Sequence, residues 1–219
     1  MARRSIAEAG IADYATAHST PPDEVQRALQ QATTEATGAW AGMQIGADQG
    51  AFMSILVGIL QPSFAVEVGT FTGYSSLAIA KALPDGGRLL CCDISEEWTA
   101  IAREHWEKAG VADRIELVIA PAVETLAGLP AEQQIDFAFI DADKTGYRDY
   151  YEEILKRLSP TGVILIDNTL WGAQVLPDSG TDDDDTNALR ALNDFIVSDE
   201  RVEVAQLTVG DGVTMVRRR

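Results

Sequence analysis

Residues 64–83 read FAVEVGTFTGYSSLAIAKAL, and this stretch decides the fold of the 219-residue chain. Residues 64–68 are mostly apolar and are followed at once by a glycine, which is typical of a buried strand. Residues 69–73 have a glycine at each end and predict a tight loop, and residues 74–83 predict a helix. A strand, a glycine-bearing loop and a helix in this order open an α/β unit.

The alternation of strand and helix continues towards the C-terminus. Further strands are predicted at residues 88–93, 115–119, 136–140 and 162–166, and helices between Ser95 and Gly110 and at residues 123–129, 147–158 and 187–197. Residues 202–209 and 213–216 flank Gly210-Asp211-Gly212 and predict an antiparallel hairpin. The predicted fold class is therefore α/β, a doubly wound, Rossmann-like sheet of seven strands, mostly parallel, with helices on both faces.

The N-terminal part of the chain predicts two helices, at residues 23–40 and 48–60. The second has apolar residues at the spacing of a single helix face, and that face is expected to be buried: Phe52, Ile55, Leu56, Ile59 and Leu60. We expect one domain over residues 1–219, made of an N-terminal helical cap (1–60) and a Rossmann-like core (61–219).

The composition excludes several classes of partner. Lys and Arg number 17 and Asp and Glu 34, so the net charge is −17, which speaks against nucleic acid and against an anionic membrane surface. No apolar run is long enough to span a bilayer, and the start MARRSIAEAGIADY lacks the apolar core of a secretory signal. Cys91 and Cys92 are adjacent and bridge poorly, so a cytoplasmic location is expected.

Polar residues recur where the predicted strands end, which is where doubly wound sheets bind ligands. Gly69 and Gly73 frame the first loop, and Asp93 ends the second strand, where an acidic side chain can accept both ribose hydroxyls. The glycine loop and Asp93 together predict a cofactor that contains adenosine. Glu67 stands just before the loop and would repel the pyrophosphate of a dinucleotide. S-adenosyl-L-methionine has no phosphate and fits better, with Glu67 facing its amino group and the loop amides its carboxylate.

Three oxygen-bearing side chains follow the fourth and fifth predicted strands. Asp141 comes after residues 136–140, and Asp167 and Asn168 come after residues 162–166. Oxygen ligands on neighbouring strand ends suit a hard divalent cation, with Mg²⁺ the first choice. The histidines, His18 and His105, are too few and too far from this set for a zinc site.

Six segments, taken in order, resemble the cation-dependent class I O-methyltransferases of the caffeoyl-coenzyme-A and catechol type, including bacterial small-molecule members. The segments are VEVGTFTGYSSLAIAKALPDGG (66–87), CCDIS (91–95), WEKAGVADRIEL (106–117), FAFIDADKTGYRDYYE (137–152), LIDNTLWGAQV (165–175) and DGVTMVRR (211–218). The resemblance covers residues 45–218 and implies an enzyme that methylates a hydroxyl of a vicinal diphenol. It also implies a homodimer.

The resemblance assigns roles to individual residues. It implies metal ligands at Asp141, Asp167 and Asn168, and a methyl-donor site formed by Ile45, Glu67, Gly69, Thr70, Ser75, Asp93, Ala122, Asp141 and Asp143. Lys144 matches the lysine beside the reacting hydroxyl; if neutral it would act as general base, and if charged it would only steady the phenolate. Two departures are Ala120-Pro121-Ala122, where a glycine often opens the segment, and Gly172, where plant members often have asparagine.

The acceptor is expected to be a small phenol that contacts Met43, Lys144, Asn168 and Trp171, with Tyr147 as a further wall. Residues 171–186, which include four consecutive aspartates, are predicted to form a mobile flap with the aspartates facing water. Two alternatives stay open from the sequence. One is an NAD-dependent oxidoreductase, which the charge of Glu67 disfavours; the other is a non-catalytic cofactor-binding homologue, which would not need the metal ligands or Lys144.

Overall fold

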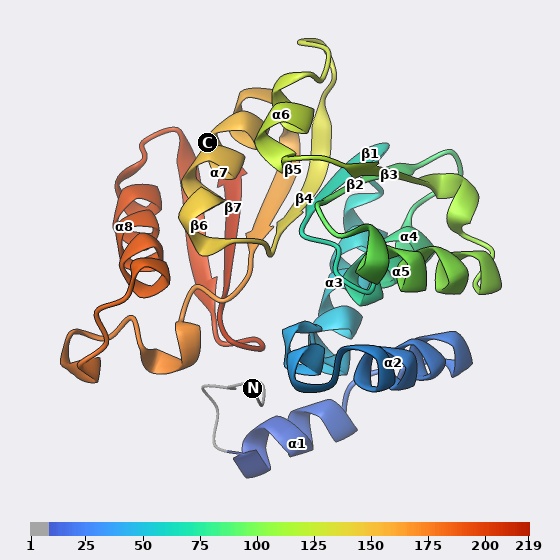
Figure 1. Ribbon diagram of the computed structural model, residues 1–219. Helices are drawn as coiled ribbons and strands as arrows, with labels where there is room; N and C mark the ends of the chain where they lie inside the picture. The colour runs from blue at the N-terminus through green and yellow to red at the C-terminus, as the bar shows by residue number, and fades with distance from the viewer. Residues whose placement is uncertain (1–8) are drawn as a thin grey trace.

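The computed structural model describes residues 9–219, and within them seven strands form one sheet (Figure 1). The strands are β1 (Phe64–Val68), β2 (Arg88–Asp93), β3 (Ile115–Ile119), β4 (Ile135–Ile140), β5 (Leu158–Ile166), β6 (Val202–Leu207) and β7 (Val213–Arg218). Their order is β3-β2-β1-β4-β5-β7-β6, with β1 to β5 parallel and β7 antiparallel to both neighbours. The predicted fold class is confirmed.

Helices cover both faces of this sheet. They are α1 (Ala9–Ala17), α2 (Glu24–Thr37), α3 (Ala47–Leu60), α4 (Tyr74–Ala82), α5 (Glu96–Lys108), α6 (Ala122–Ala127), α7 (Tyr147–Arg157) and α8 (Asp184–Ser198). Short 3₁₀ helices are η1 (Gly38–Met43), η2 (Ala112–Arg114), η3 (Lys144–Gly146), η4 (Trp171–Ala173) and η5 (Pro177–Ser179). Residues 1–8, which hold both arginines of the predicted non-secretory start and the beginning of the predicted cap, lie outside the described residues.

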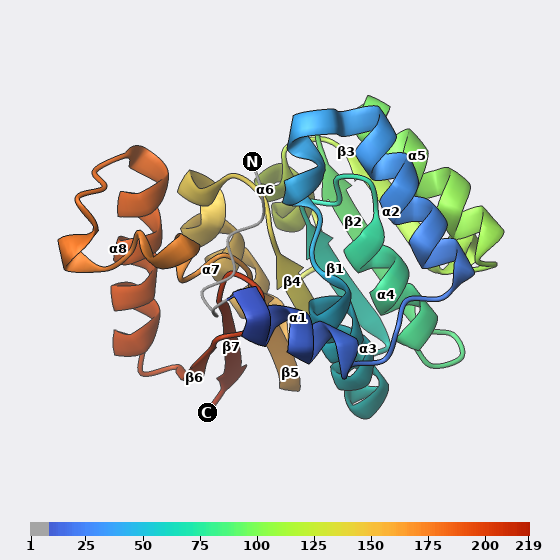
Figure 2. The same cartoon turned by 90° about the horizontal axis from the view of Figure 1, so that it is seen from below.

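Two hydrophobic cores lie on opposite faces of the sheet because side chains alternate along each strand. Val66 and Val68 of β1 pack with α6, α7 and α8 on one face. Ala65 packs with α2, α3, α4 and α5 on the other, and Figure 2 shows α2 lying against α5. Glu67 alternates to this second face, where it lies in the apolar interior.

The chain reverses its direction of winding between β1 and β4, which are neighbours in the sheet. Such a switch point opens a crevice beyond the carboxyl ends of the strands. The loop after β1 and the loop after β4 therefore lie side by side, and β5 brings a third loop next to them. The sheet topology therefore brings together the polar residues that follow β1, β4 and β5.

The predicted buried face of α3 is only partly right, because Phe52, Leu56 and Leu60 pack against the core but Ile55 and Ile59 do not. Ile55 and Ile59 are 60% and 73% exposed, whereas Met53 and Val57 are fully buried. The helix is apolar on nearly every side, so the spacing of its apolar residues does not select one face. The buried side of α3 includes Gly50, where the absence of a side chain lets the ring of Tyr74 in α4 pack closely against the helix.

Other boundaries shifted by smaller amounts. The strand predicted at residues 162–166 begins at Leu158, because Ser159 and Pro160 continue the extended backbone. The helix predicted at residues 23–40 ends at Thr37, where Gly38 has a φ of 54°, and η1 follows. Asp23 and Gln26 close a capping box at its start.

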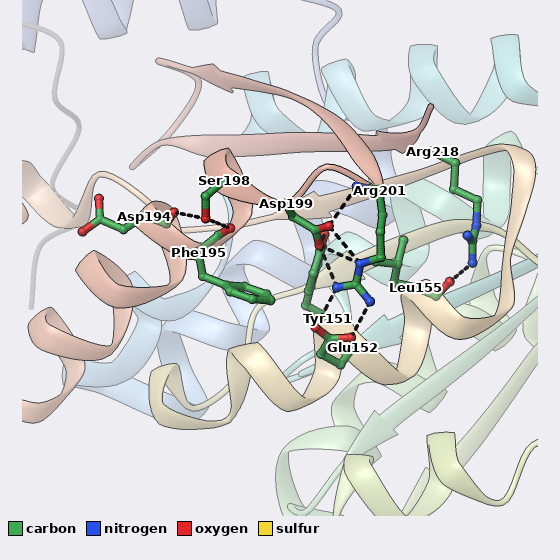
Figure 3. A network of polar contacts seen from close by, with 9 residues as sticks. All are labelled: Tyr151, Glu152, Leu155, Asp194, Phe195, Ser198, Asp199, Arg201 and Arg218. Carbon is green, nitrogen blue, oxygen red and sulfur yellow. Dashed lines mark hydrogen bonds and ion pairs between the residues drawn. The ribbon is translucent and has the colours of Figure 1, made fainter.

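An ion-pair network joins the end of α8 to α7 (Figure 3). The Arg201 guanidinium donates to Asp199 Oδ2 at 2.7 Å and to Glu152 Oε1 at 2.7 Å. The Tyr151 hydroxyl also donates to Asp199 Oδ2, at 2.9 Å. These bonds hold the pKa of the Asp199 carboxyl down at about 2.

In residues 9–219 no single helix has both the length and the apolar character that crossing a bilayer requires, although the bent pair Glu24–Met43 and Ala47–Leu60 passes by length and composition alone. Cys91 and Cys92 are both free and buried. The cytoplasmic location and the division into a cap and a core stay predictions.

Candidate functional site

A cavity of about 590 Å³ opens at the carboxyl ends of β1, β4 and β5. Its walls come from the loops that follow these strands, from η1 and the residues after it, and from the beginning of α8. Of the predicted site residues, it is lined by Met43, Ile45, Gly69, Thr70, Ser75, Asp141, Asp143, Lys144, Asp167, Asn168 and Trp171. Glu67, Asp93 and Ala122 are not among the lining residues.

The glycine loop is tight because it passes directly against the end of β4. Gly69 has a φ of +89°, and a Cβ atom there would lie 1.9 Å from the carbonyl oxygen of Asp141. A Cβ atom at Gly73 would lie 2.4 Å from the Cβ of Ala102 in α5. Both positions therefore require glycine, one to bring the loop to the site and the other to pack α4 against α5.

Asp93 holds the glycine loop in place. Its Oδ2 accepts hydrogen bonds from the amides of Thr70 and Phe71, both at 2.8 Å, and its Oδ1 accepts from Ser95 at 2.7 Å. The amides of Thr70 and Phe71 already donate to this partly buried carboxylate, so the expectation that the loop amides bind the cofactor carboxylate stays a prediction. Contact between Asp93 and a ribose stays a prediction, as does contact with Ala122.

Glu67 lies fully buried behind the cavity wall. Cys91 Sγ donates to its Oε2 at 3.4 Å, whereas Oε1 has no hydrogen-bond partner within residues 9–219. Burial raises the pKa of the Glu67 carboxyl to about 8, and the nearby hydroxyls of Ser75 and Thr70 only partly oppose this rise. A buried acceptor without a partner is costly, so this atom fits a cationic donor such as the amino group of the methyl donor.

Asp141, Asp167 and Asn168 meet at one side of the cavity. The amide of Asp141 donates to Val68 of β1 and that of Asp167 to Ile140 of β4, so the strand pairing fixes both backbones. Asn168 has a φ of +58°, a conformation that asparagine tolerates better than most residues, and its amide donates to Asp167 Oδ1 at 2.8 Å.

The donor set of these three residues consists of oxygen atoms only, which fits a hard divalent cation. Within residues 9–219 no group of three or more His, Cys, Asp or Glu side chains is placed to hold a metal ion, and the predicted set itself has two carboxylates and one amide. The side-chain oxygens of Asp141, Asp167 and Asn168 fit such a cation by donor type, and a metal at this position stays a prediction.

Lys144 is buried beside this set. Its Nζ donates to Asp141 Oδ1 at 3.1 Å, to the carbonyl of Ala142 at 2.9 Å and to the Tyr147 hydroxyl at 2.6 Å. These three acceptors match in number the three N–H donors of a lysine ammonium group. The Trp171 ring lies 5.6 Å from Nζ, which places the cation against an aromatic wall.

Asp211 holds the loop after β5 in place, although the sequence indicates it only as part of a hairpin turn. Asp211 is buried, lines the cavity and accepts a hydrogen bond from the amide of Gly172. Its carbonyl accepts from Leu170 at 3.2 Å, and the carbonyl of Gly212 accepts from Thr169 at 3.0 Å. The sequence does not show this role of Asp211, because the β6–β7 turn reaches the loop after β5 only through the pairing of β7 with β5.

The predicted flap at residues 171–186 is pinned by one side chain. The Arg190 guanidinium donates to the carbonyls of Gln174, Val175, Leu176 and Thr181. Asp182 to Asp185 are exposed, as expected, but Asp183 caps α8 and both Asp183 and Asp185 line the cavity. The mobility of the segment stays a prediction.

A doubly wound sheet with a glycine loop and acidic strand ends around one cavity, and a buried glutamate behind its wall, is typical of the Rossmann-like, S-adenosylmethionine-dependent methyltransferases. The family model described as O-methyltransferase matches residues 16–219. A probable caffeoyl-CoA O-methyltransferase of Dictyostelium discoideum is 40% identical over 211 residues, covering 95% of this chain and 91% of that protein.

Two solved structures agree. The Bacillus cereus O-methyltransferase in complex with S-adenosylhomocysteine has a TM-score of 0.86 at 30% identity, covering 96% of this chain and 97% of that one. The O-methyltransferase TomG of Streptomyces achromogenes, involved in tomaymycin synthesis and bound to S-adenosylmethionine, has a TM-score of 0.85 at 27% identity, covering 95% and 96%. The chain belongs to the O-methyltransferase family and is an S-adenosylmethionine-dependent O-methyltransferase. The oxidoreductase and non-catalytic alternatives are not favoured.

Proposed function

We propose that the protein transfers the methyl group of S-adenosylmethionine to one hydroxyl of a vicinal diphenol, with a divalent cation, Mg²⁺ first, as cofactor. The observation that carries this proposal is the meeting of Asp141, Asp167 and Asn168 with Lys144 and the glycine loop around one cavity. The caffeoyl group in the name of the Dictyostelium relative is itself a vicinal diphenol, which supports the same acceptor class.

The methyl donor is held by groups on the β1 side of the cavity. Glu67 Oε1, buried behind the cavity wall, would accept from its amino group once the donor is bound, and Thr70 and Ser75 line the cavity beside it. A carboxylate facing the donor also favours a molecule with a positive sulfur centre over one with phosphates. These contacts fix the donor while the S–CH₃ bond breaks and the O–CH₃ bond forms.

The acceptor ring is held by apolar and aromatic side chains. Trp40 and Met43 of η1 face the cavity together with Trp171 from the loop after β5. Such walls orient a planar ring and exclude water, which favours the meeting of an anionic oxygen with a cationic sulfur. When bound, a divalent cation holds two neighbouring phenolic oxygens and lowers the pKa of the hydroxyl that is methylated.

Lys144 acts on the charge of the acceptor. Its ammonium group lies within 3.1 Å of Asp141 and is fixed by Tyr147. In this position it stabilises the phenolate through charge, which is the second of the two roles that the sequence leaves open.

The experiment is a methyl-transfer assay with 4-methylcatechol and labelled methyl donor. We expect EDTA to abolish transfer and added Mg²⁺ to restore it. The double variant Asp141→Ala/Asp167→Ala should lose transfer at all Mg²⁺ concentrations while its circular dichroism spectrum stays that of the wild type. Full activity of the double variant, or of the EDTA-treated wild type, would contradict the metal role.

A further inference from the structure

The cavity is lined by many more carboxylates than cations. The aspartates that line it are Asp141, Asp143, Asp167, Asp183, Asp185 and Asp211. Lys144 is the one Lys, Arg or His among the described lining residues. A caffeoyl-CoA acceptor carries phosphates, so this distribution of charge bears directly on which acceptor enters.

A separate observation shows that the cavity is built for a ligand. Thr70 is only 2% exposed and lines the cavity, and its hydroxyl lies near the Glu67 carboxyl, whose pKa it lowers, but makes no hydrogen bond of good geometry within residues 9–219. An unpartnered polar group of this kind costs free energy unless a ligand satisfies it. The carboxylates therefore surround a ligand site and are not merely an exposed acidic surface.

The aspartates that lie deeper in the cavity already have hydrogen-bond or ion-pair partners. Lys144 pairs with Asp141, and the Asn168 amide donates to Asp167. Asp143 accepts from the Tyr150 hydroxyl at 2.6 Å. A divalent cation at Asp141 and Asp167 would balance their two charges, so the deep part of the cavity has little net charge left to discriminate between acceptors.

Asp183 and Asp185 form the charged rim, at the start of α8. Asp183 accepts from the Thr186 amide at 2.8 Å, and this bond lowers the pKa of its carboxyl. Asp185 lies in the first turn of α8, at the positive end of the helix dipole. The positive charge of Arg190 lies near enough to help lower the pKa of Asp183, but its guanidinium donates hydrogen bonds to carbonyls of residues 174–181 and not to Asp183 or Asp185.

We propose that Asp183 and Asp185 select the acceptor by charge, favouring a vicinal diphenol that bears a protonated amine and rejecting one that bears phosphates or a carboxylate. This inference rests on the proposed function, since it concerns the acceptor of that reaction. The diphenol end lies among the metal ligands and Lys144, and the substituent of the ring points to the rim. A positive substituent there meets two carboxylates, and a negative one is repelled by them.

The experiment measures binding without turnover. Wild type saturated with S-adenosylhomocysteine and Mg²⁺ is titrated with three catechols of similar size: dopamine, 4-ethylcatechol and 3,4-dihydroxyphenylacetate. We expect dopamine to bind tightest and the acid weakest, with about fivefold between successive ligands at low salt. Raising the ionic strength should compress this order, because the rim is exposed to water.

Two double variants separate the rim from the general charge of the protein. Asp183→Asn/Asp185→Asn keeps a capping residue at the start of α8 and should reduce the dopamine-to-acid preference about tenfold or more. The matched control is Asp182→Asn/Asp184→Asn, which removes the same charge from neighbouring exposed residues that do not line the cavity. The control should keep the wild-type preference, and KM values for methyl transfer should follow the same pattern.

Equal binding of the three catechols by wild type would overturn the inference, and so would equal loss of preference in both double variants. Methylation of 4-ethylcatechol in either of those cases would leave the proposed function standing. If no catechol of any charge binds or is methylated, the proposed function fails and this inference fails with it.

Discussion

Glu67 is the residue whose chemistry depends most on burial. The sequence shows a glutamate in an apolar strand, and the charge argument against a pyrophosphate follows from that alone. Only the structure shows that Oε1 is buried without a partner within residues 9–219 and that burial raises the pKa to about 8. In the free protein at neutral pH the carboxyl group is therefore mostly protonated.

Binding of the methyl donor should release a proton from Glu67. The cationic amino group favours the carboxylate, so affinity for S-adenosylmethionine should rise with pH up to about 8. Calorimetry at pH 7 in two buffers of different ionisation enthalpy should show close to one proton released per chain. Glu67→Gln should abolish this release and weaken binding about 10- to 100-fold. The control, exposed Glu107→Gln, should behave as wild type, and an unchanged proton release in Glu67→Gln would contradict the assignment.

Lys144 should act on the rate of transfer more than on donor binding. Lys144→Met removes a charge that lies beside Asp141 and Tyr147, and kcat should fall about 100-fold or more because phenolate stabilisation is lost. Affinity for S-adenosylhomocysteine should stay within about twofold, and Lys156→Met, an exposed change on α7, should leave both unchanged. A kcat within twofold of wild type in Lys144→Met would contradict the role.

At the scale of elements, the loop after β5 is held in an uncommon backbone conformation. Four of the five non-glycine residues with positive φ in residues 9–219 lie in the two loops that border the cavity: Phe71, Asn168, Trp171 and Ala173. Strained backbone of this kind persists only where neighbouring groups hold it. Here the β6–β7 turn supplies those groups, and no local pattern in the sequence indicates it.

The variant Asp211→Ala should therefore weaken binding of the acceptor, although Asp211 is not one of the proposed metal ligands. Losing the bond to the Gly172 amide frees the loop that carries Trp171, so KM for the acceptor should rise about tenfold while donor affinity is retained. Asp211→Asn keeps an acceptor oxygen and should recover most of the loss. If both variants are impaired equally, the negative charge and not the hydrogen bond is what matters.

The corner between α8, β6 and α7 should lose stability in acid. The pKa of Asp199 is depressed from 3.8 to about 2, so its contribution is complete above pH 3.8 and is lost as pH falls through about 2. Asp199→Asn should lower the free energy of unfolding by about 1 kcal/mol at pH 7, a modest value because Arg201 is half exposed. In urea unfolding this difference should shrink between pH 4 and pH 2.5. Asp194→Asn, exposed on the same helix, should show no such difference.

At the scale of the whole molecule, the sequence predicts the sheet well because its strands are continuous apolar runs between glycines and turns. The ends of β1, β2 and β3 agree with their predicted residues. The face of α3 could be predicted only in part, because a helix that is apolar all round does not show which neighbour it meets. The acidic rim at Asp183 and Asp185 was expected to face water only, and its place at the cavity depends on where α8 begins.

Part of the net charge of −17 now has a location. The carboxylates that line the cavity would attract the proposed divalent cation and the sulfonium donor, and the remainder gives the protein an acidic surface. The homodimer implied by the family resemblance stays a prediction.

We propose that a divalent cation at Asp141, Asp167 and Asn168 recognises two neighbouring hydroxyls of the acceptor. The most direct measurement is the dissociation constant of 4-methylcatechol and of 4-methylphenol, with S-adenosylhomocysteine bound, in the presence and absence of Mg²⁺. We predict that Mg²⁺ strengthens binding of the diphenol by about tenfold or more and leaves the monophenol unchanged. Equal effects of Mg²⁺ on the two ligands, or no effect on either, would contradict the account.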